Sequence, residues 1–236
     1  MSTKSETLPG TGTAWSDGTG GTERSPWEQW AVFGGFVFVA VGVVTSFLPG
    51  APPASDAPAA KVAAYFRDHA GAIEAQQVIG AIGTIALFWW FGALWRRMTR
   101  AEGARPLLAT VAVVSFAIGV SLAMASGTMT STAAIRIDSL GDGSQLLWTL
   151  SLVTIATAGF AMASFIAAAC LLNQRTRFVP VWTNALGALA AVAFVIGGFG
   201  AGTDANAVNL FNLVAFLAFC VWIVAVSAYL WRDARS

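Results

Sequence analysis

The sequence predicts an all-α, polytopic membrane protein with six transmembrane helices, and three observations lead to this fold class. The 236-residue chain is 56% hydrophobic and only 11% charged, whereas about a quarter of the residues of a soluble domain are charged. Six segments are long and apolar enough to cross a bilayer, which takes about 20 helical residues. Basic residues also gather in alternate connections between these segments, as in other multi-pass membrane proteins.

The six predicted spans are separated by connections that contain helix breakers, such as LPGAPP after the first and GARP before the third. The spans cover about 29–48, 72–95, 107–127, 146–171, 181–201 and 208–230. Together they form one predicted transmembrane domain over 27–232. The preceding residues, 1–26, are rich in Gly, Ser and Thr and have little apolar content, so we predict a disordered cytoplasmic tail.

The basic residues predict that both termini are cytoplasmic. With the N-terminus inside, ten Lys and Arg residues fall on the cytoplasmic side, and three, Lys61, Arg67 and Arg136, fall outside. Tryptophans mark the same inner boundary, where amphipathic rings are favoured. They are Trp27, Trp30, Trp95, Trp182 and Trp231.

A short amphipathic helix is predicted outside the membrane at about 55–69. Val62, Tyr65, Phe66 and His69 recur at the spacing of one helical face, and the segment is too short to cross a bilayer. We expect this helix to lie on the outer membrane surface or over the bundle.

Two stripes of small residues predict a tight interface between the third and fourth spans, because small side chains let helix backbones approach closely in lipid. The stripes are Ser115, Gly119, Ala123 and Gly127 on the third span and Gly159, Ala163 and Ala167 on the fourth. Such faces also suit self-association, and the sequence leaves open whether they pair within one chain or in a homo-oligomer.

Polar residues near the predicted outer ends of the helices form the candidate site, a shallow external vestibule. Its members are His69, Glu74, Gln77, Asp204, Asn209 and Asn212. A carboxylate at Glu74 could bind an ion or exchange a proton, but an acid in the first turn of a helix is also favoured by the helix dipole. The asparagines could line a polar cavity or form hydrogen bonds between helices. Both interpretations stay open, and the structural one is favoured for each group.

The central half of every predicted span lacks ionisable residues, and the chain has one histidine and no HExxH, phosphate-loop or GxSxG motif. We therefore predict no catalytic residues, no metal site and no cofactor. The formal net charge of +1 gives no general basic face, so nucleic acid is not an expected partner.

Several segments resemble a group of six-helix membrane proteins of unknown function that is common in actinobacteria. They are LPGAPP, DAPAAKVAAYFRDHAGAIEAQQ, FWWFGALWRRMTRAEG and FVPVWTNALGALAAVAFVIG, and the likeness covers most of 40–230. In that group a proline and aromatic pair usually introduces the fifth span, which looks like Pro180 and Trp182 here. The resemblance implies six helices and a bacterial inner membrane, and it implies no site residues.

Two functional hypotheses follow from the sequence. The first is a non-enzymatic membrane component that binds a protein partner or a lipid of the surrounding bilayer. The alternative is a small-solute channel or carrier with a polar external mouth near Glu74.

Overall fold

The computed structural model describes residues 26–199 and 206–235, and the regular structure in this part of the chain is helical. The helices are α1 (Pro26–Ser46), α2 (Ala59–Glu102), α3 (Leu107–Ile135), α4 (Ile137–Leu140), α5 (Gly143–Thr176), α6 (Thr183–Phe199) and α7 (Asn206–Arg235). Each predicted span has its own helix among α1, α2, α3, α5, α6 and α7. The tail predicted over 1–26 lies outside the described residues, apart from Pro26.

Four of the described helices are long and apolar enough to cross a membrane, namely α2, α3, α5 and the part of α7 from Phe211 to Asp233. The apolar parts of α1 and α6, Trp30–Ser46 and Thr183–Phe199, are shorter. The chain is therefore an all-α bundle whose long helices have the dimensions and composition of membrane-spanning helices.

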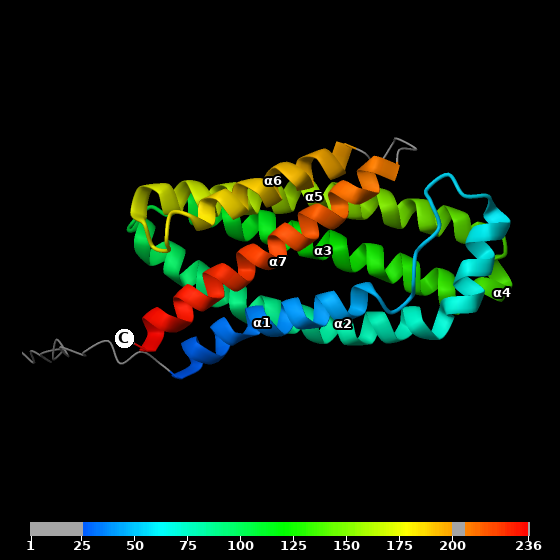
Figure 1. The fold of residues 1–236 in the computed structure, drawn as a ribbon, viewed down its shortest axis with the longest axis horizontal. Helices are drawn as coiled ribbons and strands as arrows, with labels where there is room; N and C mark the ends of the chain where they lie inside the picture. Colours follow the sequence, from blue (N-terminus) through cyan, green and yellow to red (C-terminus); the bar gives the residue numbers. More distant parts are fainter. Residues whose placement is uncertain (1–25, 200–205, 236) are drawn as a thin grey trace, which may run out of the picture.

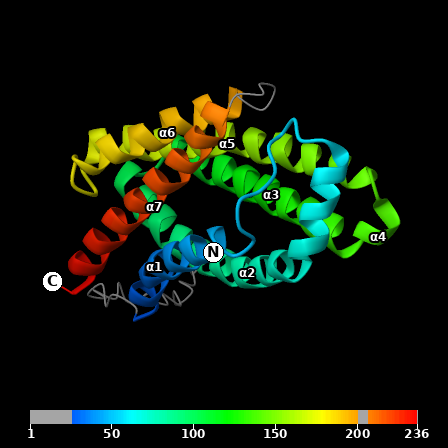
Figure 2. The same cartoon turned by 45° about the vertical axis from the view of Figure 1, so that its right-hand side comes forward.

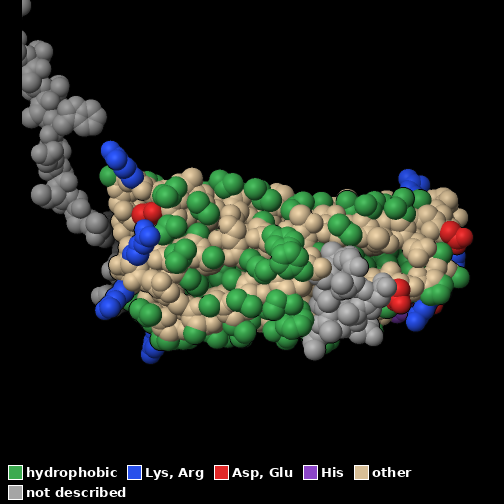
Figure 3. All heavy atoms as spheres, turned by 90° about the horizontal axis from the view of Figure 1, so that it is seen from above, with side chains coloured by type: hydrophobic (Ala, Val, Ile, Leu, Met, Phe, Trp, Pro, Cys, Tyr) green, Lys and Arg blue, Asp and Glu red, His purple; other side chains and the backbone are tan. Residues whose placement is uncertain are grey.

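The long helices run back and forth along the long axis of the molecule (Figure 1). Each packs against the next in sequence, with α3 and α5 the most extensive pair, and α7 closes the ring by packing against α1. Figure 2 shows the beginning of α1 and the end of α7 at the same end of the bundle. On the face seen in Figure 3, charged side chains gather at the two ends, and hydrophobic side chains are spread over the length between them.

An aromatic cluster fills the middle of the bundle around Phe165 of α5, which is fully buried. Its ring packs edge-on against Phe91 of α2, Phe116 of α3 and Trp222 of α7, with centroid distances of 5.5, 5.3 and 5.8 Å. Phe91 and Phe116 are themselves stacked at 3.8 Å. These rings tie four helices together in a closely packed apolar centre.

The amphipathic helix predicted at about 55–69 differs from the structure at both of its ends. It is the first part of α2, which begins at Ala59 and continues without interruption into the second predicted span. In Figures 1 and 2 this first part crosses one end of the bundle before α2 turns along the long axis. Val62 and Phe66 are fully buried there, and the Phe66 ring packs edge-on against Trp148 of α5. Of the two positions expected for this segment, the structure has it over the bundle.

The separate helix end expected near His69 is absent because nothing in the sequence stops the helix there. No proline follows, and Gly71 is tolerated inside a helix at a cost of about 1 kcal/mol. The residues on both sides of Gly71 belong to the same buried cluster, in which Phe66 and Ile73 take part.

Candidate functional site

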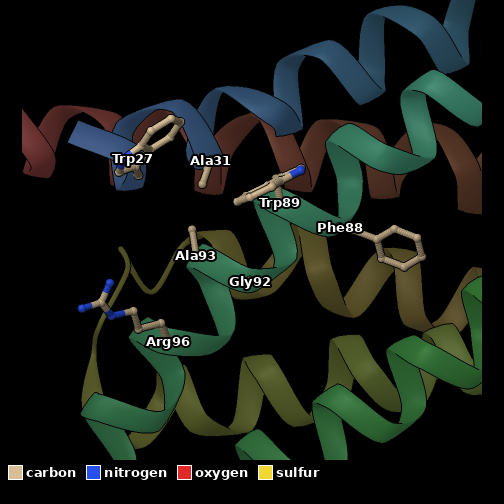
Figure 4. A pocket seen from close by; sticks show the side chains of 7 residues that line it. All are labelled: Trp27, Ala31, Phe88, Trp89, Gly92, Ala93 and Arg96. Atoms are coloured by element: carbon tan, nitrogen blue, oxygen red, sulfur yellow. The ribbon is translucent and has the colours of Figure 1, made fainter. Parts of the chain in front are cut away.

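A cavity in the described part of the chain lies between α1 and α2. Its volume is about 380 Å³, within the range of about 300–1,000 Å³ typical of small-molecule sites. Figure 4 shows the lining residues along α2, from Phe88 to Arg96, with α1 opposite. The lining consists of Trp27, Ala31, Phe88, Trp89, Gly92, Ala93 and Arg96.

Helical spacing explains why α2 presents this wall. Phe88, Trp89, Gly92, Ala93 and Arg96 follow one another at intervals of one, three, one and three residues, which keeps them on one face. In the middle of this face Gly92 has no side chain, and a Cβ added there would meet no atom within 4 Å. The cavity therefore exists because α2 has no side chain at Gly92, where α1 passes it.

The path of α1 is set by a close crossing next to the cavity. A Cβ on Gly34 would overlap the backbone oxygen of Ala86, so the two backbones touch at this point. At the next residue of α1, a Cβ on Gly35 would collide with the Trp90 ring and the Ser227 hydroxyl. The glycine pair lets α1 lie against both α2 and α7. The cavity occupies the space between this crossing and the arginine-rich end of α2, which carries Arg96, Arg97 and Arg100.

The described residues that line the cavity are apolar except for one, Arg96, which is charged. Trp27 and Trp89 remain 75% and 64% exposed and Phe88 47% exposed, so aromatic faces border the opening. Arg96 lies at the end of the lining nearest the other arginines of α2 (Figure 4). Such a surface suits a long apolar ligand with a polar head at one end.

The described residues of the predicted vestibule have contacts with other parts of the chain. His69 stacks on Tyr65 with a centroid distance of 4.6 Å, and its Nδ1 lies 2.9 Å from the Tyr65 carbonyl oxygen. Glu74 is exposed, whereas Gln77 is half-buried and faces α3, where a Cβ on Gly127 would lie 2.7 Å from its Oε1. Gln77 therefore contacts α3, while Glu74 lies on the exposed surface.

The asparagine side of the vestibule is described only in part. Asn212 faces α6, where its Oδ1 occupies the place that a Cβ on Gly197 would take. Asp204 lies outside the described residues, and Asn209 lies in α7 without a described side chain. The ion-handling role of Glu74 stays a prediction. Nearby on α2, Gln76 has a structural contact, because its Nε2 donates to the Thr45 carbonyl oxygen of α1 at 3.1 Å.

The first part of the small-residue stripe on α3 contacts α5, and its last part contacts another helix. The Ser115 hydroxyl donates to Ser164 of α5 at 3.0 Å, and a Cβ on Gly119 would lie 2.7 Å from the Met162 sulfur of α5. At the far end Gly127 faces α2 through Gln77, as described above. The stripe on α3 therefore serves two neighbours.

The corresponding stripe on α5 also departs from the prediction. A Cβ on Gly159 would lie 3.0 Å from the Phe194 backbone oxygen, so this glycine belongs to the contact with α6 and not to the one with α3. Ala163 is buried, Ala167 is exposed, and Ala123 of α3 is half-buried. The reason is that α5 packs against α2, α3 and α6 at once, so that successive small residues face different helices.

Two buried polar groups were not among the predicted site residues. Asn173 of α5 donates from Nδ2 to Asn184 Oδ1 of α6 at 2.8 Å and accepts from the Val179 N–H at 3.0 Å. Between α3 and α5, the Ser151 hydroxyl lies 2.8 Å from the hydroxyls of both Ser126 and Thr130. Asparagines flanking a short turn and hydroxyl residues four apart were the available sequence signals for these contacts.

The remaining polar features have structural roles. Glu102 accepts from the first amides of α3, Leu108 N and Ala109 N, at 2.8 Å each, and so caps that helix. Arg97 of α2 pairs with Asp233 of α7 at the arginine-rich end. Among the described residues, His, Cys, Asp and Glu form no group of three that could hold a metal ion.

No protein-family model, no curated protein and no solved structure matches this chain. The described fold and cavity define it as a helical bundle of membrane-protein type with an apolar cavity on its flank.

Proposed function

We propose that this chain is a multi-pass membrane component of the bacterial inner membrane, with six transmembrane helices and both termini cytoplasmic. We further propose that it is non-enzymatic and binds a membrane lipid in the cavity between α1 and α2. Four long apolar helices support its embedding in a bilayer, and the ten-to-three distribution of basic residues supports the orientation.

One observation carries the lipid proposal, namely the apolar, aromatic-walled cavity with an arginine at one end. The cavity opens on the flank of the bundle, where the side chains of Trp27, Phe88 and Trp89 are exposed. In a bilayer this flank faces the hydrocarbon core, so lipid acyl chains are the molecules available to occupy the cavity. The tryptophans at the opening suit the boundary between hydrocarbon and headgroups.

A protein partner, including a second copy of the chain, is the competing occupant. A helix from another protein would bury Trp27 and Trp89 as a lipid would, but a volume of about 380 Å³ is small for a helix of about 10 Å diameter and is enough for part of a flexible chain. The small-solute channel predicted around Glu74 receives less support, since the aromatic cluster around Phe165 fills the middle of the bundle.

Native mass spectrometry of the full chain, extracted in a mild detergent, tests the proposal. Gly92→Leu fills the cavity, and Gly80→Leu is its matched control, because a Cβ at either position of α2 meets nothing within 4 Å and Gly80 does not line the cavity. We expect the wild type and Gly80→Leu to retain a lipid of defined mass and Gly92→Leu to lose it. Equal retention by all three would count against the cavity, and a retained protein subunit in place of lipid would favour the competing occupant.

A further inference from the structure

The end of the bundle next to the cavity has a marked excess of positive charge. Among the side chains that the structure describes, seven arginines and two acids lie there. The arginines are Arg96, Arg97, Arg100, Arg105, Arg175, Arg177 and Arg232, and the acids are Glu102 and Asp233. Figure 3 shows Lys and Arg side chains projecting around this end.

Both of these acids already have partners within the protein. The two carboxylate oxygens of Glu102 each accept one amide of the first turn of α3, and Asp233 pairs with Arg97. They reduce the positive charge of this end without cancelling it, since seven arginines face two carboxylates. The field at the mouth of the cavity therefore favours an anionic ligand group.

Within this basic end, Arg96 is the one arginine that lines the cavity. It follows Gly92 by one turn on the same face of α2, so its guanidinium lies at the end of the apolar lining (Figure 4). A guanidinium carries five N–H donors and binds phosphate in a bidentate manner, so it can serve a phosphate together with a partner from the protein. Trp27 and Trp89 border the same opening, and tryptophan is enriched where lipid headgroups meet hydrocarbon chains.

We propose that the cavity between α1 and α2 selects an anionic phospholipid, with an acyl chain along Phe88 and Gly92 and the headgroup phosphate at Arg96. This inference rests on the lipid binding proposed above and adds the class of lipid. A zwitterionic lipid has the same chain and phosphate but carries a compensating cation, which the surrounding arginines disfavour.

Photo-cross-linking in nanodiscs tests this selectivity. The full chain is reconstituted in phosphatidylcholine with a small share of a probe lipid that carries a diazirine in one acyl chain, and the probe is either phosphatidylglycerol or phosphatidylcholine. Labelling of the peptide that contains 88–96 is measured by mass spectrometry. We expect the phosphatidylglycerol probe to label this peptide about fivefold more, which corresponds to about 1 kcal/mol for one arginine near a membrane surface.

Three substitutions separate the contribution of the headgroup from that of the cavity. Arg96→Gln should lower labelling by phosphatidylglycerol to the level of phosphatidylcholine, and Arg100→Gln, at an arginine outside the cavity lining, should preserve most of the preference. Gly92→Leu should abolish labelling of this peptide by both probes.

The outcomes distinguish the two proposals. Equal labelling by both probes in the wild type, with loss in Gly92→Leu, would overturn the anionic selectivity and leave lipid binding in place. Labelling that Gly92→Leu does not change would overturn both, because the probe would then report only the lipid around any exposed helix. An equal loss in Arg100→Gln and Arg96→Gln would assign the preference to the basic end as a whole and refute the site at Arg96.

Discussion

Replacing Phe165 by alanine should destabilise the bundle more than any equal truncation on its surface. Phe165 is fully buried and packs against Phe91, Phe116 and Trp222 at the distances given above, and against Phe219 with a centroid distance of 6.5 Å. Four ring contacts from three other helices are lost together in Phe165→Ala. The substitution therefore weakens the packing between helices and leaves the helices themselves intact.

The magnitude follows from the empty volume and from the lipid environment. Removing the ring leaves about 100 Å³, which at about 24 cal/mol per Å³ costs about 2.4 kcal/mol. The transfer term that applies in water is largely absent, because helices separated in a membrane still have lipid around them. Lost edge-to-face contacts add about 1 kcal/mol, so we expect a loss of about 3 kcal/mol.

Reversible unfolding by increasing SDS in mixed micelles, followed by tryptophan fluorescence and circular dichroism, measures this difference. Phe160→Ala on the same helix is the control, because Phe160 is 39% exposed and its one ring contact is with Phe199 at 5.2 Å. We expect the control to lose less than about 1 kcal/mol. Equal losses in the two variants would refute the view that the aromatic cluster holds the bundle together.

Three further predictions concern the helix contacts. Gly34→Ala should destabilise the protein by about 1–3 kcal/mol, because the added methyl group overlaps the backbone of α2. Its control is Gly71→Ala, whose methyl group meets no atom within 4 Å and should be neutral or stabilising in the same SDS titration. Equal effects of the two substitutions would contradict the close crossing at Gly34. Asn173→Ala should lower the stability by about 2 kcal/mol, because it leaves the Val179 N–H buried without its acceptor. A Tm unchanged in a thermal scan would contradict this and show that water replaces the side chain. Glu102→Ala should cost about 1 kcal/mol and speed hydrogen exchange in the first turn of α3, and unchanged exchange there would argue against the cap.

The helical class of the fold could be predicted from the sequence because apolar length and charge placement are local properties. The predicted first span, 29–48, and α1, Pro26–Ser46, differ by two or three residues at each end. The end of the predicted external helix near His69 was wrong, because burial of Phe66 and Ile73 in one cluster keeps α2 continuous there. That cluster includes residues of α3 and α5, which no local pattern could supply.

The candidate site was harder to predict, because it depends on how each helix is rotated about its axis. Glu74 and Gln77 are three residues apart, yet one is exposed and the other faces α3. The cavity beside Gly92 results from a glycine on each of two helices, a crossing at Gly34 and a bare position on α2. A glycine in a long apolar segment signals either close contact or open space, and only the packed structure distinguishes the two.

A structure of the wild-type chain in a lipid nanodisc, determined by cryo-electron microscopy, tests the central claim most directly. The account predicts continuous density for one acyl chain between α1 and α2, passing Gly92 and ending in headgroup density at Arg96. A cavity closed by movement of α1 onto α2, or occupied by a helix of another subunit, would contradict it.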